Sequence, residues 1–195
     1  MQQLPIEIPP WTWPVAGGVL AAAVLAWGYI RFRAYRARKA IDAAISCVAY
    51  EMLKNVLVPN GNGGHIHIHY LLLTQRGLLV VDLLDHPGAV FGGDQMVEWT
   101  VIGKKHRFTF PNPQHALYDR MAAVRLLTGD IPVEGRVLFT TRSEFPKGKP
   151  RNVARIDELT EEFPVVDTAR GNITAAFADV WTYVKKNAQP NPLAS

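Results

Sequence analysis

The sequence predicts an α/β or α+β domain in which helices flank a mixed β-sheet, preceded by one long apolar segment. Apolar runs of strand length alternate with stretches whose apolar residues recur at helical spacing, an order typical of sheets covered by helices. The runs at 71–73 and 78–81 are continuously apolar, which indicates strands buried on both faces. With 195 residues, the chain is long enough for one domain with a hydrophobic core and a short additional segment.

The segment Trp11–Ile30 contains no charged residue and is apolar almost throughout. As a helix it would span about 30 Å, roughly the hydrocarbon thickness of a bilayer. Tryptophan or tyrosine stands near both of its ends, as is common at membrane–water interfaces. A cleaved signal peptide is the alternative, but no basic residue precedes the run and arginines follow it directly. We therefore expect a transmembrane helix over residues 11–30.

The distribution of charge predicts the orientation of this helix. Residues 1–10 contain no Lys or Arg, whereas five cations lie within residues 31–39. Because basic residues are retained on the cytoplasmic side, we expect a single-pass protein of a bacterial inner (cytoplasmic) membrane, with its N-terminus outside. The expected parts are an extracytoplasmic stub at 1–10, a transmembrane helix at 11–30, a basic juxtamembrane segment at 31–39, a cytoplasmic domain at 40–187 and a disordered tail at 188–195.

The basic character of the chain comes from the juxtamembrane segment. The chain has 21 Lys and Arg against 17 Asp and Glu, and its isoelectric point is about 9.3. Without the five juxtamembrane cations and Glu7, residues 40–195 hold 16 of each sign. The isoelectric point therefore reports a segment suited to anionic lipid headgroups and is no sign of nucleic-acid binding by the domain. The single cysteine, Cys47, excludes an internal disulfide and fits a reducing compartment.

Helix and strand signals follow one another through the domain. The first helix is predicted because Ile41, Ile45, Val48 and Met52 recur on one face. A later helix begins at Asn112, where a capping residue precedes a proline. The predicted elements are a helix at 34–54, a loop at 59–64, strands at 65–74 and 78–84 joined by a turn, short strands at 89–91, 98–102 and 107–110, a helix at 112–129, a strand at 133–140, a small acidic helix or turn at 157–162 and a helix at 172–186.

The order of motifs in the domain resembles that of the nuclease-related domain (NERD) family, which is distantly restriction-endonuclease-like. The resemblance covers roughly residues 38–160, and the matching residues are Gln75–Asp82, Gly88, Val90, Gly92, Trp99, Asn112-Pro113 and Val137–Thr140. It implies a restriction-endonuclease-like fold, an Asp in a Gln-Ile-Asp run on the first strand of the hairpin and a Glu-x-Lys on the second. The two carboxylates would bind a divalent metal that activates water, and the lysine would orient that water.

The hairpin keeps one of these three groups. Counting from Gly77 places the Gln-Ile-Asp positions at 67–69 and the Glu-x-Lys positions at 82–84. Asp82 is present, but His69 stands where the acid is expected and Leu84 where the lysine is expected. We therefore expect Asp82 and His69 to be vestigial catalytic positions in a membrane-anchored domain without nuclease activity that acts as an interaction or nucleic-acid-associated module. The alternative is an active metal-dependent nuclease with a rearranged site of Asp82, His69 and Asp42.

A second hypothesis concerns the histidines of the same hairpin. His65, His67 and His69 alternate along one strand and share a face, and Asp82 across the hairpin supplies a further metal-ligand type. These four residues are candidate ligands for a divalent metal, zinc for a histidine-rich set or magnesium in the nuclease alternative. The other interpretation is a half-solvated polar strand face without a ligand. A histidine-based metal sensor is a third hypothesis for the function.

Two basic loops are candidate contacts for phosphates. The candidate nucleic-acid residues are Lys104, Lys105, Arg107, Lys147 and Lys149. Solvated hairpin tips are the alternative, because no aromatic residues alternate with the cations. The expected partners are thus a lipid bilayer, an unidentified protein and nucleic acid, and the sequence does not determine the oligomeric state.

Overall fold

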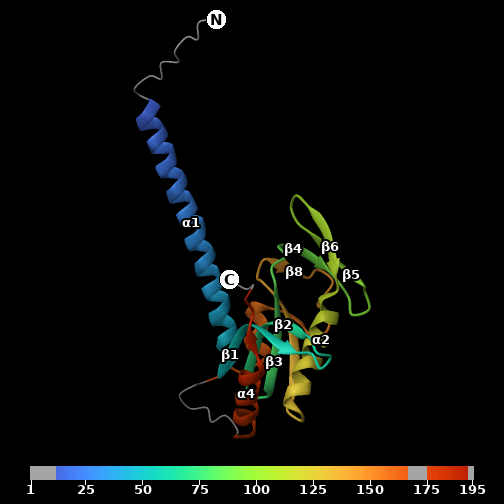
Figure 1. Ribbon diagram of the computed structural model, residues 1–195. Coiled ribbons are helices and arrows are strands. Elements are labelled where there is room, and N and C mark those ends of the chain that lie inside the picture. The colour runs from blue at the N-terminus through green and yellow to red at the C-terminus, as the bar shows by residue number, and fades with distance from the viewer. Residues whose placement is uncertain (1–11, 167–174, 193–195) are drawn as a thin grey trace, which may run out of the picture. The chain divides into compact units, whose positions relative to one another are not determined.

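A computed structural model describes residues 12–166 and 175–192 of the chain, which forms two units, Met1–Asp42 and Ala43–Ser195 (Figure 1). In the described part of the second unit, the main sheet has six strands in the order β10-β1-β2-β3-β7-β9. Neighbouring strands from β10 to β3 are antiparallel, whereas β7 is parallel to β3 and β9 is parallel to β7. The bounds are β1 Glu51–Pro59, β2 His65–Thr74, β3 Gly77–Leu84, β7 Val133–Phe139, β9 Val153–Arg155 and β10 Gln189–Pro190.

A smaller second sheet has the strand order β6-β5-β4-β8 among the described residues. Its strands are β4 Gly88–Phe91, β5 Glu98–Ile102, β6 Arg107–Pro111 and β8 Ser143–Glu144. Two loops join its first three strands. One joins β4 to β5 at residues 92–97, and the other joins β5 to β6 at residues 103–106.

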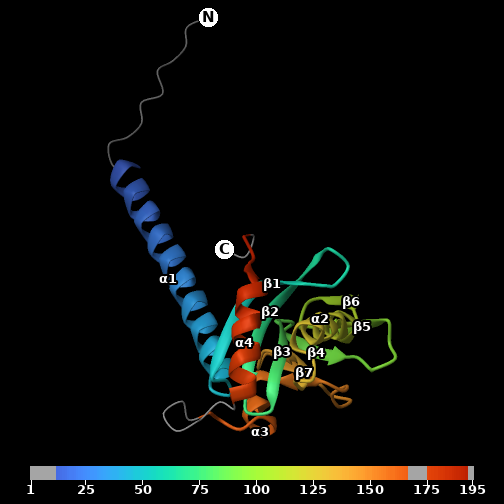
Figure 2. The same cartoon turned by 60° about the horizontal axis from the view of Figure 1, so that its bottom comes forward.

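Helices cover the main sheet, as the fold class predicts. Helix α2 (Pro113–Thr128) packs on β7, β3 and β2, and α4 (Ala175–Asn187) packs on β1 and α2 (Figure 2). The apolar core between them includes Leu71 of β2, Val80 of β3 and Trp181 of α4. The remaining helical segments are α1 Thr12–Ser46, the 3₁₀ turn η1 Ile156–Glu158 and α3 Leu159–Glu162. A mixed sheet flanked by helices is thus confirmed.

The helix predicted over 34–54 is wrong beyond residue 46. Helix α1 ends at Ser46, and β1 begins at Glu51 and runs antiparallel to β2. Tyr50 already donates its backbone N–H to Leu73 O at 2.8 Å, so the backbone hydrogen bonds of this segment are formed with the sheet and not within a helix. The residues buried within β1, Val56 and Val58, alternate with the period of a strand.

The C-terminal residues extend the main sheet. The sequence places residues 188–195 in a disordered tail, but β10 pairs with β1, and Asn191 N donates to Asn55 O at 2.9 Å. Residues 193–195 lie outside the described residues. The edge strands β8, β9 and β10 are only two or three residues long, too short for an alternation of apolar and polar residues to predict them.

The structure does not support the predicted transmembrane helix. Helix α1 contains most of the apolar segment at 11–30. Within residues 12–166 and 175–192, however, no helix combines the length and the apolar character that crossing a bilayer requires. Residues 1–11, which hold the predicted extracytoplasmic stub, lie outside the described residues. Orientation and location therefore stay predictions.

Candidate functional site

The candidate site is built around Asp82, on the face of β3 that lies beneath α2. Asp82 alternates with Val80 and Leu78, so the pleat directs its carboxylate into the side of the sheet that packs on this helix. Only 4% of Asp82 is exposed. A carboxylate buried to this extent must be paired and hydrogen-bonded, because its charge is costly to remove from water.

Two side chains pair with the Asp82 carboxylate, one on each oxygen. Arg120 of α2 donates from Nη1 to Oδ2 at 2.8 Å, and His69 Nδ1 lies 3.2 Å from Oδ1. Arg120 also donates from Nε to the backbone oxygen of His67 at 2.7 Å. The guanidinium therefore ties α2 to both strands of the hairpin. His69 is placed by the β2–β3 register, which continues one residue beyond Tyr70↔Val81 to set His69 opposite Asp82.

Sequence reasoning missed Arg120. The signal was available, since Arg120 lies on the same helical face as Leu117, Met121 and Val124. A cation on the face that a helix turns toward a sheet needs a buried partner. The buried acid of the hairpin is that partner.

His67 lies beside this cluster, and its pKa is shifted downward. Burial lowers the pKa of His67, and the nearby His69 and Arg120 act in the same direction, while Asp82 opposes them. Its Nε2 atom is buried and has no hydrogen-bond partner in the described part of the chain. The rings of His67 and His69 meet edge to face, with centroids 4.9 Å apart.

The structure does not bring the four candidate metal ligands His65, His67, His69 and Asp82 together as a metal site. No group of three or more His, Cys, Asp or Glu side chains among the described residues could hold an ion. His65 lies exposed at the start of β2, opposite Pro59. At Asp82, the Arg120 guanidinium already supplies positive charge, and a cation brought beside it would be repelled. The residues present do not fit a divalent metal.

Comparison with known families places most of this domain in one family. The family model of the nuclease-related domain matches residues 33–140, more than half of the 195 residues. The chain belongs to the NERD family. It is similar to an uncharacterized protein of Bacillus anthracis, with 27% identity over 79 residues that cover 40% of this chain and 37% of that protein. The match thus spans little more than a third of that relative. No solved structure matches the chain.

Residue 84, where the NERD pattern leads us to expect a lysine, is part of the hydrophobic packing. Leu84 is half-buried and lies against the hydrophobic core. The neighbouring acid, Asp85, accepts a hydrogen bond from Thr140 Oγ1 at 2.7 Å and forms an ion pair with Arg142. Asp85 therefore does not join the Asp82 cluster. Asp42, which the nuclease alternative invokes, lies on α1 in the other unit of the chain.

Other residues of the NERD resemblance form a clamp that fixes the β4–β5 loop. Trp99 is fully buried and donates from Nε1 to Gly93 O at 3.2 Å. Asn112 caps α2 by accepting from Gln114 N at 2.9 Å, and it donates from Nδ2 to Met96 O at 2.9 Å. Gly92 is required beside the indole, because a Cβ there would lie 2.3 Å from the Trp99 ring. These motif residues stabilise the β4–β5 loop and the start of α2.

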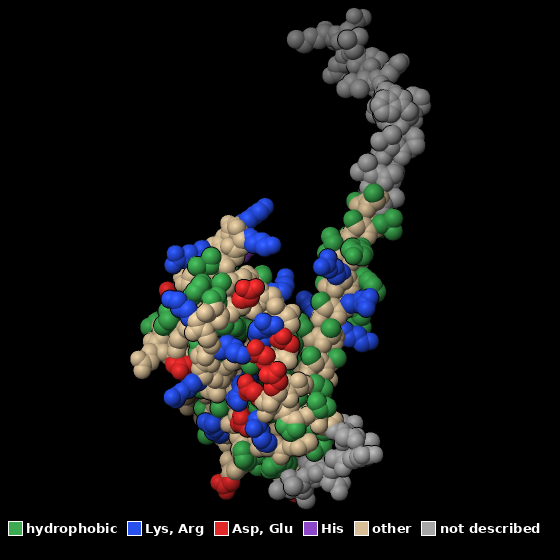
Figure 3. Space-filling view, turned by 180° about the vertical axis from the view of Figure 1, so that it is seen from behind, with side chains coloured by type: hydrophobic (Ala, Val, Ile, Leu, Met, Phe, Trp, Pro, Cys, Tyr) green, Lys and Arg blue, Asp and Glu red, His purple; other side chains and the backbone are tan. Residues whose placement is uncertain are grey.

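The candidate nucleic-acid residues differ in how their charges are balanced. Lys104, Lys105 and Arg107 lie exposed at the β5–β6 tip, and no described carboxylate is within ion-pair distance of them. Cationic side chains project at this tip in Figure 3. Lys147 is exposed on another loop, whereas the ammonium of Lys149 is paired with Glu158. The unbalanced positive charge of the set is thus centred on the tip.

Proposed function

We propose that this NERD domain does not hydrolyse phosphodiesters through its hairpin and acts as an interaction module. The observation that carries the proposal is the pairing of both Asp82 oxygens, with Arg120 and with His69. Leu84 adds to it, because an apolar side chain cannot orient an attacking water.

The chemistry of the paired groups supports this proposal. A hydrolytic carboxylate must offer lone pairs to a metal, and a guanidinium at 2.8 Å takes the charge-assisted hydrogen bond instead. Arg120 cannot serve as a general base, since arginine stays protonated in proteins. Asp82 is therefore engaged by Arg120, and among the described residues the cluster contains no second acid that could share a metal with it.

A nicking assay with the full chain tests the proposal. Supercoiled plasmid would be incubated with wild type, with Asp82→Asn and with Asp119→Asn, an exposed acid of α2 that serves as the matched control. Magnesium, manganese and zinc would each be supplied. We expect the three proteins to give the same background cleavage. Cleavage by wild type and Asp119→Asn that Asp82→Asn lacks would overturn the proposal.

An active nuclease with a rearranged site is the competing function. The contact between His69 Nδ1 and Asp82 Oδ1 favours it, because a histidine oriented by a carboxylate is a common general base. The His69 side chain is 35% exposed, so solvent reaches it. In that case His69→Gln would abolish metal-stimulated cleavage as fully as Asp82→Asn.

Association with nucleic acid is the interaction that the charges of the domain favour. Its support is the tip formed by Lys104, Lys105 and Arg107, whose charges no described acid balances. Fluorescence anisotropy with a DNA duplex would compare Lys104→Gln/Lys105→Gln with Lys185→Gln/Lys186→Gln at the end of α4. We expect only the tip variant to weaken binding and to reduce the salt dependence by roughly two counterions. Equal loss in both variants would assign the binding to net charge.

We also propose that α1 attaches the chain to a membrane, leaving the NERD domain on the cytoplasmic side. Residues 22–40 of α1 are exposed, and large apolar side chains among them include Leu25 and Trp27. The cations at 31–39 suit the anionic headgroups of a cytoplasmic membrane surface. Fractionation of cells expressing the full chain tests the attachment. Recovery of the chain in the supernatant after high-speed centrifugation would reject it.

A further inference from the structure

One face of α1 combines arginines with large apolar side chains. Val24, Trp27, Arg31, Tyr35 and Arg38 follow one another at intervals of three or four residues, so they lie along the same side of the helix. All five are exposed. In Figure 3, Lys and Arg side chains alternate with hydrophobic ones along this helix.

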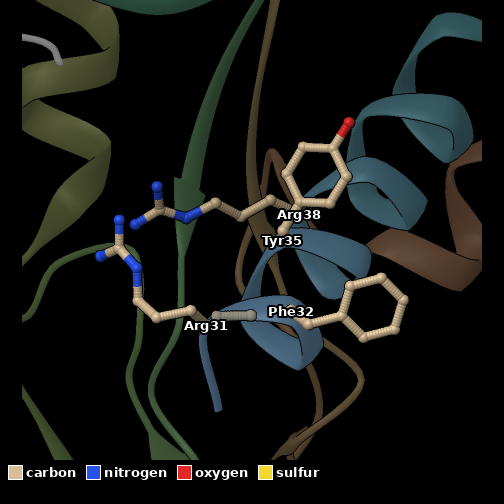
Figure 4. Close-up of a pocket in the computed structure, with 5 residues that line it drawn as sticks. Arg31, Phe32, Tyr35 and Arg38 are labelled. Carbon is tan, nitrogen blue, oxygen red and sulfur yellow. The ribbon is translucent and has the colours of Figure 1, made fainter. Parts of the chain in front are cut away.

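Two guanidinium groups flank a hollow on this face. Arg31 and Arg38 extend from the helix in the same direction, and they line the hollow together with Phe32, Ala34 and Tyr35 (Figure 4). No acidic residue occurs between Glu7 and Asp42. Neither arginine forms an ion pair within the described part of the chain. Two like charges on one side of a helix, neither of them in such an ion pair, fit an anion.

The aromatic neighbours of the two arginines indicate which class of molecule carries this anion. The Arg31 Cζ atom lies 5.8 Å from the centroid of the Trp27 ring, and Trp27 and Tyr35 are 65% and 63% exposed. Indole and phenol rings beside cations are the side chains that settle at the headgroup level of a bilayer. Toward the N-terminus the face continues in Val24, which is also largely exposed.

We propose that the arginine face, Arg31 and Arg38 with Trp27 and Tyr35, binds the phosphate of an anionic lipid headgroup at a membrane surface. The inference rests on the proposed membrane attachment and names the lipid class that the attachment selects. A guanidinium group binds phosphate through a pair of N–H donors, and a second arginine on the same face supplies a second pair. A nucleic-acid backbone offers phosphate as well, but it would leave Val24 and Trp27 in water, whereas a bilayer buries them.

Vesicle flotation with the full chain tests this inference. The probes are vesicles of phosphatidylcholine alone and vesicles with one third phosphatidylglycerol. We expect wild type to float more strongly with the anionic vesicles. Arg31→Gln/Arg38→Gln should weaken that partitioning about thirtyfold, because each cation at an anionic surface strengthens binding roughly fivefold.

The matched control is Arg33→Gln/Arg36→Gln, which removes the same charge from the opposite side of the helix. Arg36 lies 5.9 Å from the Phe32 ring centroid, so each pair contains one arginine over an aromatic ring. We expect this control to weaken partitioning less than about threefold, as residual long-range attraction allows. Glutamine keeps the helix propensity of arginine, and circular dichroism would verify equal helicity.

Four outcomes would overturn the inference in distinguishable ways. An equal loss of partitioning in both double variants would show that net charge, and not the arginine face, determines vesicle binding. Equal flotation with both vesicle types would keep the attachment and reject the anionic headgroup. Flotation with neither would reject the attachment itself. In a parallel arm, a DNA duplex whose binding falls thirtyfold in Arg31→Gln/Arg38→Gln, without any effect on flotation, would reassign the face to nucleic acid.

Discussion

Arg120 of α2 reaches the Asp82 carboxylate of β3 at 2.8 Å and forms a charge-assisted hydrogen bond beneath the helix. The side chains of Arg120 and Asp82 are 18% and 5% exposed, so the pair is shielded from water and salt. The acid that the NERD hairpin retains is thereby built into the packing of the domain. Its role in the fold can be measured separately from any catalytic role.

Arg120→Ala should destabilise the domain strongly, because it leaves the buried Asp82 charge without its cation. Removing one partner of a buried ion pair costs about 3–5 kcal/mol. The double variant Asp82→Leu/Arg120→Met should lose much less, since it replaces the pair by apolar groups. Urea unfolding of wild type, Arg120→Ala and the double variant provides the comparison. A loss in the double variant as large as that in Arg120→Ala would show that the unpaired Asp82 charge is not its cause.

Gly92→Ala should destabilise the domain through the Trp99 ring. The new Cβ would lie 2.3 Å from a fully buried indole that has no space to move, and forced overpacking costs about 1–3 kcal/mol. Gly93→Ala is the matched control, because its Cβ would meet only the flexible Met96 side chain at 3.5 Å. Thermal unfolding of both variants checks the contrast. An equal decrease in melting temperature would mean that the backbone, and not the ring, sets the cost.

His86 should make the domain less stable in acid. Burial lowers its pKa below the ordinary 6.5, with Asp85 acting in the opposite direction, and its ring lies 4.6 Å from that of Phe110. The unfolded chain therefore binds a proton at a higher pH than the folded one does. The stability that neutral His86 contributes is present above pH 6.5 and is lost as the pH falls toward its folded pKa.

His86→Phe tests this dependence, since phenylalanine suits the aromatic neighbours and cannot titrate. Free energies of unfolding in urea at pH 7.5 and pH 5.0 should differ less in the variant than in wild type. Part of the difference should persist, because the pKa of His67 is lowered as well. The exposed His115→Gln is the control. An unchanged difference in His86→Phe would contradict the assignment.

Local signals in the sequence were enough to predict the hairpin and α2. The continuous apolar runs and the Gly77 turn define β2 and β3, and the same turn sets His69 opposite Asp82. Asn112 marks the start of α2. Strand β1 was missed because the residues up to Met52 also satisfy helical spacing, and its partner β2 decides between the two. Arg120 was missed because only the packed fold shows that its guanidinium meets the hairpin acid.

Rebuilding the hairpin tests whether Arg120 excludes a metal. The double variant His69→Asp/Leu84→Lys supplies the acid and the lysine that the NERD pattern expects. With Arg120 retained, we expect no saturable manganese binding, because the guanidinium neutralises the added carboxylate as it does Asp82. Adding Arg120→Gln removes the cation and should produce a site with a dissociation constant in the range of about 10⁻⁴–10⁻³ M, typical of weak oxygen-ligand sites. Calorimetric titration measures both variants, and circular dichroism verifies that they fold. Equal manganese binding in both would show that Arg120 does not control the site.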